Sequence, residues 1–128
     1  MSQDLLNDAL TSMRNAIYAS KRSCELKASK LIGNVLKVMQ ENNYIEHFEY
    51  IDDRKGGKFK VTLSTSMNTC GIIKPRFAVK KTELEKFEAR YLPGQDFGII
   101  IVTTPQGVMD HSKAKKLGIG GKLLAYVY

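Results

Sequence analysis

The fold of this chain is decided by one stretch, Phe97-Gly98-Ile99-Ile100-Ile101-Val102-Thr103-Thr104-Pro105-Gln106-Gly107-Val108-Met109. Its first part, residues 97–102, is apolar without alternating polar positions, which predicts a strand buried on both faces. Its second part, residues 103–107, places two hydroxyls, a proline, an amide and a glycine directly after that strand, and this composition predicts a turn. Because a buried strand is rigid, we expect these polar groups to be held at a fixed place on the surface.

The flanking segments predict a C-terminal lobe over residues 67–128. Upstream, residues 70–76 indicate a short strand that ends at a proline, and Thr82 is a candidate N-cap for the helix that follows. Downstream, Asp110 is a candidate N-cap for a short lysine-rich helix that Gly118 would end, and the chain then finishes on an apolar strand. The predicted order is β-α-β with a further short helix and closing strands.

The first part of the chain, residues 1–66, predicts a second lobe. Residues 4–17 have leucines and other apolar side chains at helical spacing, and Ser29 can cap a second helix after a short edge strand. Residues 44–51 are rich in aromatic and β-branched side chains, and residues 58–63 alternate strictly after a glycine turn, as paired strands do. The predicted order is α-β-α-β-β, so the fold class is α+β in two small lobes.

Charge is distributed unevenly along the chain, which has a net charge of +7 and a pI of about 9.4. Residues 1–53 carry six basic and eight acidic side chains, whereas residues 54–128 carry fourteen basic and five acidic ones. This asymmetry indicates a basic face for a polyanion, although composition alone leaves open a surface that charge merely keeps soluble. Fixed hydroxyls and an amide in a basic field suit the backbone of a folded RNA.

Cellular location is indicated by what the sequence does not contain. The first residues lack the basic and apolar regions of a signal peptide, and Cys24 and Cys70 are too few and too scattered for a disulfide framework. The longest apolar stretch, residues 97–102, is much shorter than the about 20 residues needed to cross a bilayer. We therefore expect a cytoplasmic protein with two reduced, buried cysteines and no membrane partner.

The sequence offers no catalytic or metal-binding constellation. His47 and His111 are single and scattered, so no spacing of metal ligands appears. The triplet at residues 96–98 spells a kinase magnesium motif, but the length and the other motifs of a kinase are missing. Three glutamates within residues 83–88 predict an exposed ion-pair face of a helix. We expect neither an enzyme nor a protein with a cofactor, a metal or a small-molecule substrate.

A known family is indicated by four groups of residues in order and spacing. These groups are residues 4–16, residues 28–32 with 44–45, residues 70–77 with 91–93, and residues 97–109 with 120–121 and 126–128. Together they resemble the small-subunit ribosomal protein S8 family, in its archaeal and eukaryotic form, over nearly the full chain.

The resemblance implies a structural constituent of the small ribosomal subunit with two α+β lobes. Such a protein is a primary rRNA-binding protein that binds and fixes an irregular helix in the central domain of small-subunit rRNA during assembly. It uses mainly a loop of its C-terminal lobe, and it contacts neighbouring ribosomal proteins such as S5. Two alternatives stay open: a free RNA-binding regulator of translation, and a small RNA-acting enzyme.

The resemblance also marks the loop that would contact RNA. Thr103 and Thr104 match the first two residues of a Ser-Thr-Ser-type loop, and Gly107 matches its glycine. Pro105 stands where a third hydroxyl is usual, and Gln106 stands where bacterial members have lysine. Gln106 offers a donor and an acceptor, which suit a ribose or a base edge better than a phosphate.

Basic residues elsewhere are the candidate phosphate contacts. They are Lys30, Lys55, Lys58, Lys60, Lys74, Arg76, Lys113, Lys115 and Lys116. Lys30 has the strongest argument, because the amide dipoles at the start of a helix also favour phosphate.

Overall fold

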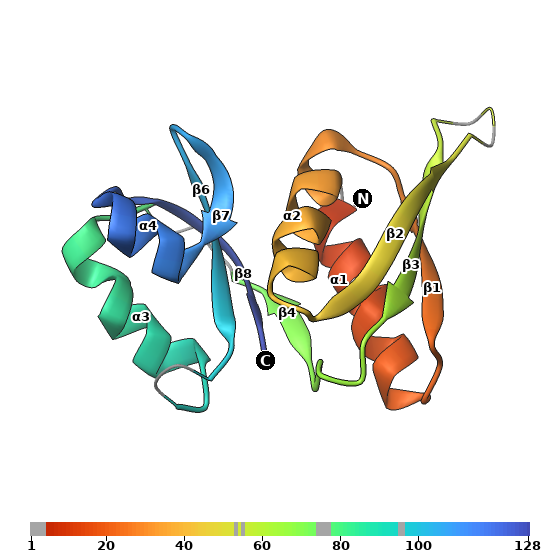
Figure 1. Cartoon of the computed structure of the whole chain (residues 1–128), viewed down its shortest axis with the longest axis horizontal. Coiled ribbons are helices and arrows are strands. Elements are labelled where there is room, and N and C mark those ends of the chain that lie inside the picture. Colours follow the sequence, from red (N-terminus) through yellow and green to blue (C-terminus); the bar gives the residue numbers. More distant parts are fainter. Residues whose placement is uncertain (1–4, 53, 55, 74–77, 95–96) are drawn as a thin grey trace. The chain divides into compact units, whose positions relative to one another are not determined.

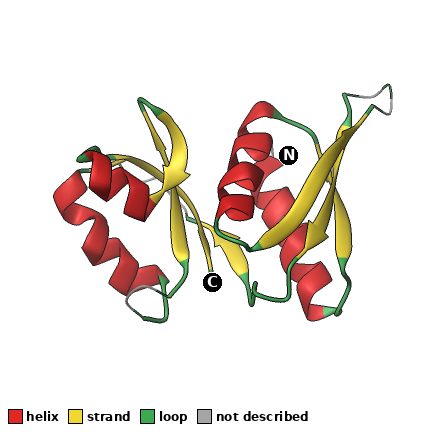
Figure 2. Ribbon diagram, in the orientation of Figure 1, coloured by secondary structure: helices red, strands yellow, loops and turns green. Residues whose placement is uncertain are grey.

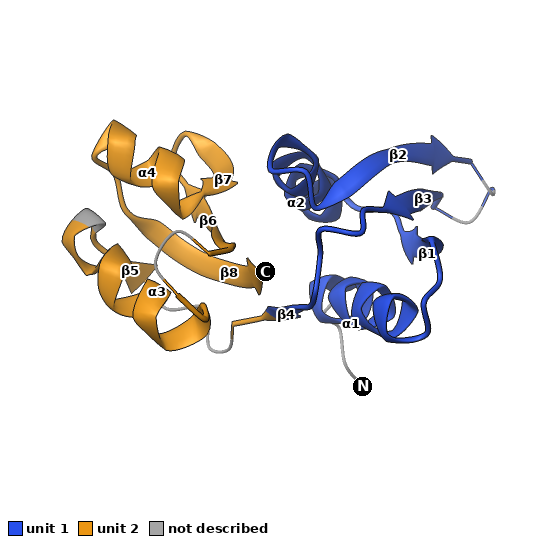
Figure 3. Ribbon diagram, turned by 60° about the horizontal axis from the view of Figure 1, so that its bottom comes forward, with its two compact units in different colours: residues 1–71 blue, residues 72–128 orange. Residues whose placement is uncertain are grey.

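The chain folds into two compact units, residues 1–71 and residues 72–128 (Figure 3). The computed structural model describes residues 5–52, 54, 56–73, 78–94 and 97–128. The boundary between the units lies within a short strand, β4 (Cys70–Ile72). The sequence analysis placed the boundary between the lobes at residues 66 and 67.

Unit 1 has the α-β-α-β-β order expected from the sequence (Figure 1). Its elements are α1 (Leu5–Tyr18), β1 (Ser23–Lys27), α2 (Lys30–Glu41), β2 (Ile45–Ile51) and β3 (Lys58–Leu63). The three strands form an antiparallel sheet in the order β1-β3-β2, so β1 is an edge strand, as expected. Both helices lie on one face of this sheet (Figure 1).

Apolar spacing produces the core of unit 1. Leu6, Leu10 and Met13 of α1 recur at helical spacing and are buried, and burial of each such side chain contributes about 1.5–3 kcal/mol. In β3, Val61 is buried and faces the helices, while its neighbours alternate outward. The Ser29 hydroxyl accepts a hydrogen bond of 3.1 Å from the Ile32 N–H, which confirms the predicted cap of α2.

Unit 2 confirms the predicted β-α-β arrangement with a further helix, and it adds two short strands. Its elements are β5 (Ala78–Val79), a 3-10 turn η1 (Lys81–Glu83), α3 (Leu84–Tyr91), β6 (Ile99–Thr104), β7 (Gly107–Asp110), α4 (His111–Leu117) and β8 (Gly121–Val127). The sheet order is β4-β8-β6-β7, and β5 also pairs with β8. Figure 2 shows α3 and α4 on the same face of this sheet.

The centre of unit 2 is formed by β6 and β8, which pair antiparallel. The first four residues of β6 are buried, as the apolar run predicts, but the strand begins at Ile99. Phe97 is 52% exposed, so the first residue of that run lies outside the core. The last strand, β8, is not an edge, because it lies between β6 on one side and β4 and β5 on the other.

One predicted helix cap is wrong. Thr82 lies inside η1, and α3 begins only at Leu84. The carboxylate of Glu83 instead reaches back and accepts a hydrogen bond of 3.0 Å from the Lys80 N–H. A carboxylate in the first turn satisfies a free backbone donor as well as a hydroxyl cap does, so the cap lies elsewhere.

Both cysteines are free thiols, but the prediction that both are buried is confirmed only for Cys70, because Cys24 is half-buried. Cys70 is fully buried, and burial raises the pKa of its thiol to about 12. Burial also raises the pKa of the Cys24 thiol to about 11. Both side chains are therefore protonated at neutral pH and pack as small apolar groups.

Candidate nucleic-acid interface

The polar turn predicted from the sequence is the tip of the β6–β7 hairpin. Thr104 pairs with Gly107 across the hairpin, and Pro105 and Gln106 form the turn between them. Proline at the first turn position excludes types I′ and II′, which need a positive φ there. Gly107 has a φ of 120°, whereas Gln106 does not have a positive φ. These angles fit a type I turn followed by a residue with a positive φ. Only glycine adopts such a φ without strain.

The hydroxyl of Thr104 holds this turn together. It donates a hydrogen bond of 2.8 Å to the Gly107 carbonyl and accepts one of 3.1 Å from the Gln106 N–H. The residue is only 9% exposed. Sequence analysis predicted that this hydroxyl contacts RNA, but in the structure its proton is used inside the turn. Thr104 therefore positions the exposed tip, which consists of Pro105, Gln106 and Gly107.

A further cation lies beside this turn and was not predicted. Lys122 is directly opposite Thr103 in the β6–β8 pairing, so both side chains leave the same face of the sheet. Lys122 is exposed and Thr103 is half-buried. Strand register alone brings the two together, because they are distant in the sequence.

Close approach of β8 to β6 at this point depends on Gly121. A Cβ atom at this residue would lie 2.1 Å from the Thr103 carbonyl oxygen, which is far closer than any atomic contact permits. Gly121 therefore allows the two strands to meet beside the candidate site.

The lysine-rich helix α4 contacts both β6 and β7 and lies beside the hairpin (Figure 1). Asp110 caps it by accepting a hydrogen bond of 2.9 Å from the Lys113 N–H, and Gly118 ends it with a φ of 68°. Both predicted ends are confirmed. Lys113 and Lys116 are exposed, so their ammonium groups are open to a ligand.

Lys115 differs from the two other lysines of α4. Its ammonium group forms an ion pair with Glu88 of α3, and the same carboxylate oxygen lies 2.7 Å from Nε2 of His111. The side chain of Glu88 is only 12% exposed. The prediction of an exposed ion-pair face on α3 is therefore wrong for Glu88, which bridges α3 to α4.

In unit 1, the predicted lysines lie on two different parts of the surface. Lys30 is the first residue of α2 and is exposed, and the first turn of that helix contains no acidic residue. Lys60 lies between Glu25 and Glu49 in the sheet register. Lys58 forms a salt bridge of 3.1 Å with Glu25. The outer face of this sheet thus has mixed charge, and both Lys58 and Lys60 already have acidic neighbours.

Three predicted contacts, Lys55, Lys74 and Arg76, lie outside the described residues. The others fall into two groups, one in each unit. In unit 2, the structure brings together the hairpin tip, Thr103 and α4; in unit 1, it presents Lys30, Lys58 and Lys60.

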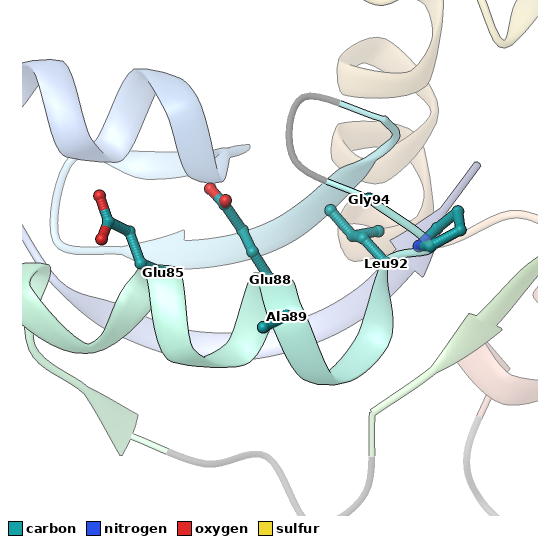
Figure 4. A pocket seen from close by; sticks show the side chains of 6 residues that line it. Glu85, Glu88, Ala89, Leu92 and Gly94 are labelled. Atoms are coloured by element: carbon teal, nitrogen blue, oxygen red, sulfur yellow. The ribbon is translucent and has the colours of Figure 1, made fainter.

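A pocket of about 430 Å³ lies beside α3 in unit 2 (Figure 4). Its lining consists of Glu85, Glu88, Ala89, Leu92, Pro93 and Gly94. Glu88 is bound to His111 and Lys115, so the carboxylates of Glu85 and Glu88 are not arranged as a general acid and a general base. Among the described residues, no group of three or more possible metal ligands occurs, either here or elsewhere.

A rigid polar turn with exposed lysines around it is typical of one class of protein: small basic α+β proteins that bind nucleic acid along a surface. Comparison with known proteins is more specific. A sequence model of the family Ribosomal protein S8 matches residues 4–128. The chain belongs to this family, whose members are ribosomal proteins and not a class of enzymes.

Individual relatives match over the full length of both chains. The chain is 60% identical to small ribosomal subunit protein uS8 of Thermoplasma acidophilum and 59% identical to that of Thermoplasma volcanium. It is 54% identical to small ribosomal subunit protein uS8 of Archaeoglobus fulgidus. The family indicated by the sequence motifs is thus confirmed. No helix among the described residues is long and apolar enough to cross a membrane.

Proposed function

We propose that the protein is a structural, rRNA-binding constituent of the small ribosomal subunit, located on the ribosome in the cytoplasm. Its full-length similarity to small-subunit uS8 proteins supports this assignment. The single observation that carries the RNA-binding proposal is the β6–β7 tip, where three exposed residues are held in one conformation by the hydroxyl of Thr104.

Gln106 is the residue that we expect to read the RNA. Its amide offers a donor and an acceptor at the exposed end of the turn. In an A-form helix, the wide minor groove exposes 2′-hydroxyls and base edges, which short polar groups can reach. Gly107 has open space where a side chain would begin, so the ribose-phosphate backbone can approach the turn closely.

Exposed lysines supply affinity without sequence preference. Lys113 and Lys116 on α4 and Lys122 beside the turn are exposed in unit 2, and Lys30 is exposed in unit 1. Lys58, Lys60 and Lys115 have acidic neighbours, so we expect each of them to contribute less to phosphate binding.

The finer part of the proposal concerns the RNA region and the neighbours. We assign the binding site to an irregular helix in the central domain of small-subunit rRNA, which the protein fixes during assembly, and we expect contacts with neighbouring proteins such as S5. The family membership supports this assignment, together with a fold that presents a rigid surface.

Calorimetric titration tests this proposal. The protein is titrated with a central-domain fragment of small-subunit rRNA, and in parallel with a helix of equal length from another domain. We expect tighter binding of the central-domain fragment at the same salt concentration, and retention of the protein on small subunits during sedimentation in high salt. Equal affinity for both RNAs, together with release from the subunits, would instead indicate a free RNA-binding regulator.

A further inference from the structure

The hairpin that carries the candidate site has an incomplete edge at its base. Strand β7 pairs with β6 only from Ile101 to Thr104, because the chain turns into α4 directly after Asp110. Ile100 is fully buried and lies one residue beyond this pairing. A buried backbone N–H without a partner is costly, so this position needs an acceptor from another source.

The acceptor is the side chain of His111. Its Nδ1 atom accepts a hydrogen bond of 3.0 Å from the Ile100 N–H, and the residue is only 3% exposed. An accepting Nδ1 carries no proton, so the proton of the neutral imidazole is on Nε2. Nε2 lies 2.7 Å from the carboxylate of Glu88 and donates to it.

One imidazole therefore joins three elements of unit 2. It completes the edge of β6, it begins α4, and it binds α3 through Glu88. Lys115 of α4 binds the same carboxylate oxygen and strengthens the link between the helices. The charged and titratable groups that face the imidazole are Glu88, Lys115 and Asp110.

We propose that His111 is a positioning residue for the RNA-binding hairpin, and that it keeps β6, β7 and α4 in register only while its imidazole is neutral. The effect on RNA rests on the function proposed above. The effect on the hairpin does not, because it follows from the geometry at Ile100 alone. Protonation would place a hydrogen on Nδ1, directly facing the Ile100 N–H, so two donors would oppose each other.

Acidic pH should therefore weaken the hydrogen bond between the Ile100 N–H and His111. Burial lowers the pKa of His111 from its ordinary value of 6.5, and Lys115 lowers it further, whereas Glu88 and Asp110 oppose this shift. Between pH 6.5 and the lower pKa of the folded state, His111 is protonated in the unfolded chain but neutral in the folded protein. The stabilisation by His111 is thus complete above about pH 6.5 and declines as the pH falls toward the lower, folded-state pKa.

The tautomer and the hydrogen bond can be tested without RNA. Imidazole nitrogen spectra of the native protein should show the Nε2–H tautomer for His111. Amide hydrogen exchange should show a protected Ile100 N–H at pH 7.5 that becomes less protected in acid. An Nδ1–H tautomer, or an unprotected Ile100 amide, would overturn the proposal. His47, the other histidine of the chain, serves as the reference signal.

Two variants separate the hydrogen bond from the titration. His111→Asn retains an acceptor near the Nδ1 position but cannot be protonated, so we expect native protection of Ile100 with little pH dependence between pH 5 and 7. His111→Leu removes the acceptor, and protection should fall by about 10- to 100-fold. Ser112→Leu, at the exposed neighbouring position, is the matched control and should leave protection unchanged. If His111→Leu does not fold, a pH dependence of His111→Asn equal to that of the native protein would still refute the proposal.

The effect on RNA is tested by measuring the affinity for the central-domain fragment at pH 7.5 and at pH 5.5. Native affinity should fall more between these values than that of His111→Asn. If no variant binds the fragment, the proposed function fails while the tautomer and exchange results stand. If the RNA binds and the two proteins respond equally to pH, the positioning role fails instead.

Discussion

Two neighbouring threonines have different roles at the tip of the β6–β7 hairpin. The sequence presents Thr103 and Thr104 as equivalent hydroxyls at the end of a strand. In the structure, the hydroxyl of Thr104 makes two hydrogen bonds within the turn, while Thr103 lies opposite Lys122 on the other face of the strand. Mutation should therefore separate the role of Thr104, which fixes the turn, from that of Gln106, which we propose contacts RNA.

Thr104→Val should destabilise the protein. The substitution removes both turn hydrogen bonds, and we expect the free energy of unfolding to fall by about 1–3 kcal/mol in urea denaturation. Thr103→Val makes the same chemical change one residue earlier and should cost less. Equal losses for the two variants would contradict the assigned role of Thr104.

Gln106→Ala should leave stability nearly unchanged but weaken RNA binding. The side chain is exposed, so stability should change by no more than about 0.5 kcal/mol. Binding of the central-domain RNA should weaken by about 1–3 kcal/mol if the amide reads a ribose or a base. Gln40→Ala, at an exposed position on α2, is the matched control for RNA binding only, because the Gln40 amide donates a hydrogen bond of 3.2 Å to the Glu46 carbonyl. Unchanged affinity in calorimetry would exclude Gln106 as the reading residue.

At the scale of elements, the site depends on how β8 meets β6. The C-terminal strand occupies the interior of the sheet and approaches the end of β6 so closely that only glycine fits at Gly121. Gly107 is different, because a Cβ atom there would meet open space and the cost of a side chain arises only from its positive φ.

Alanine substitutions at these two glycines should therefore differ in cost. Gly121→Ala would force β8 away from the Thr103 carbonyl and should lower the free energy of unfolding by about 2–3 kcal/mol or more. Gly107→Ala should cost about 1–2 kcal/mol, which is the strain of a left-handed residue. Chemical denaturation of both variants gives the comparison, and a larger loss for Gly107→Ala would contradict this account of the strand pairing.

At the scale of the whole molecule, net charge is a poor guide to which lysines bind RNA. Residues 54–128 hold most of the basic side chains, but Lys58 and Lys115 form ion pairs with glutamates. Lys58 and Lys60 have glutamate neighbours on the sheet, whereas Lys113 and Lys116 are exposed on α4.

The salt dependence of RNA binding should reveal this difference. Replacing Lys113 and Lys116 by alanine should reduce the slope of log K against log salt by about 1.5, which corresponds to two phosphate contacts. Replacing Lys58 and Lys60 should change it less. The measurement is a filter-binding titration at four salt concentrations, and the reverse order would show that the mixed-charge face of unit 1 is the main phosphate contact.

The sequence by itself determined the α+β class, most helix and strand positions, the caps at Ser29 and Asp110, and the family. These features depend on local periodicity, on capping chemistry and on motifs, all of which are properties of short segments. The loop was also found from sequence, because a polar turn after an apolar run is a local signal.

Only the tertiary structure decided which side chains are available to a ligand. The commitment of Thr104 to its own turn, the ion pair of Lys115 with Glu88 and the position of Lys122 beside Thr103 all depend on register and packing. The same holds for His111, whose sequence neighbours give no sign that it completes a strand edge at Ile100. The physical reason is that hydrogen bonds and ion pairs join residues that are close in space, and periodicity along the chain does not encode those distances.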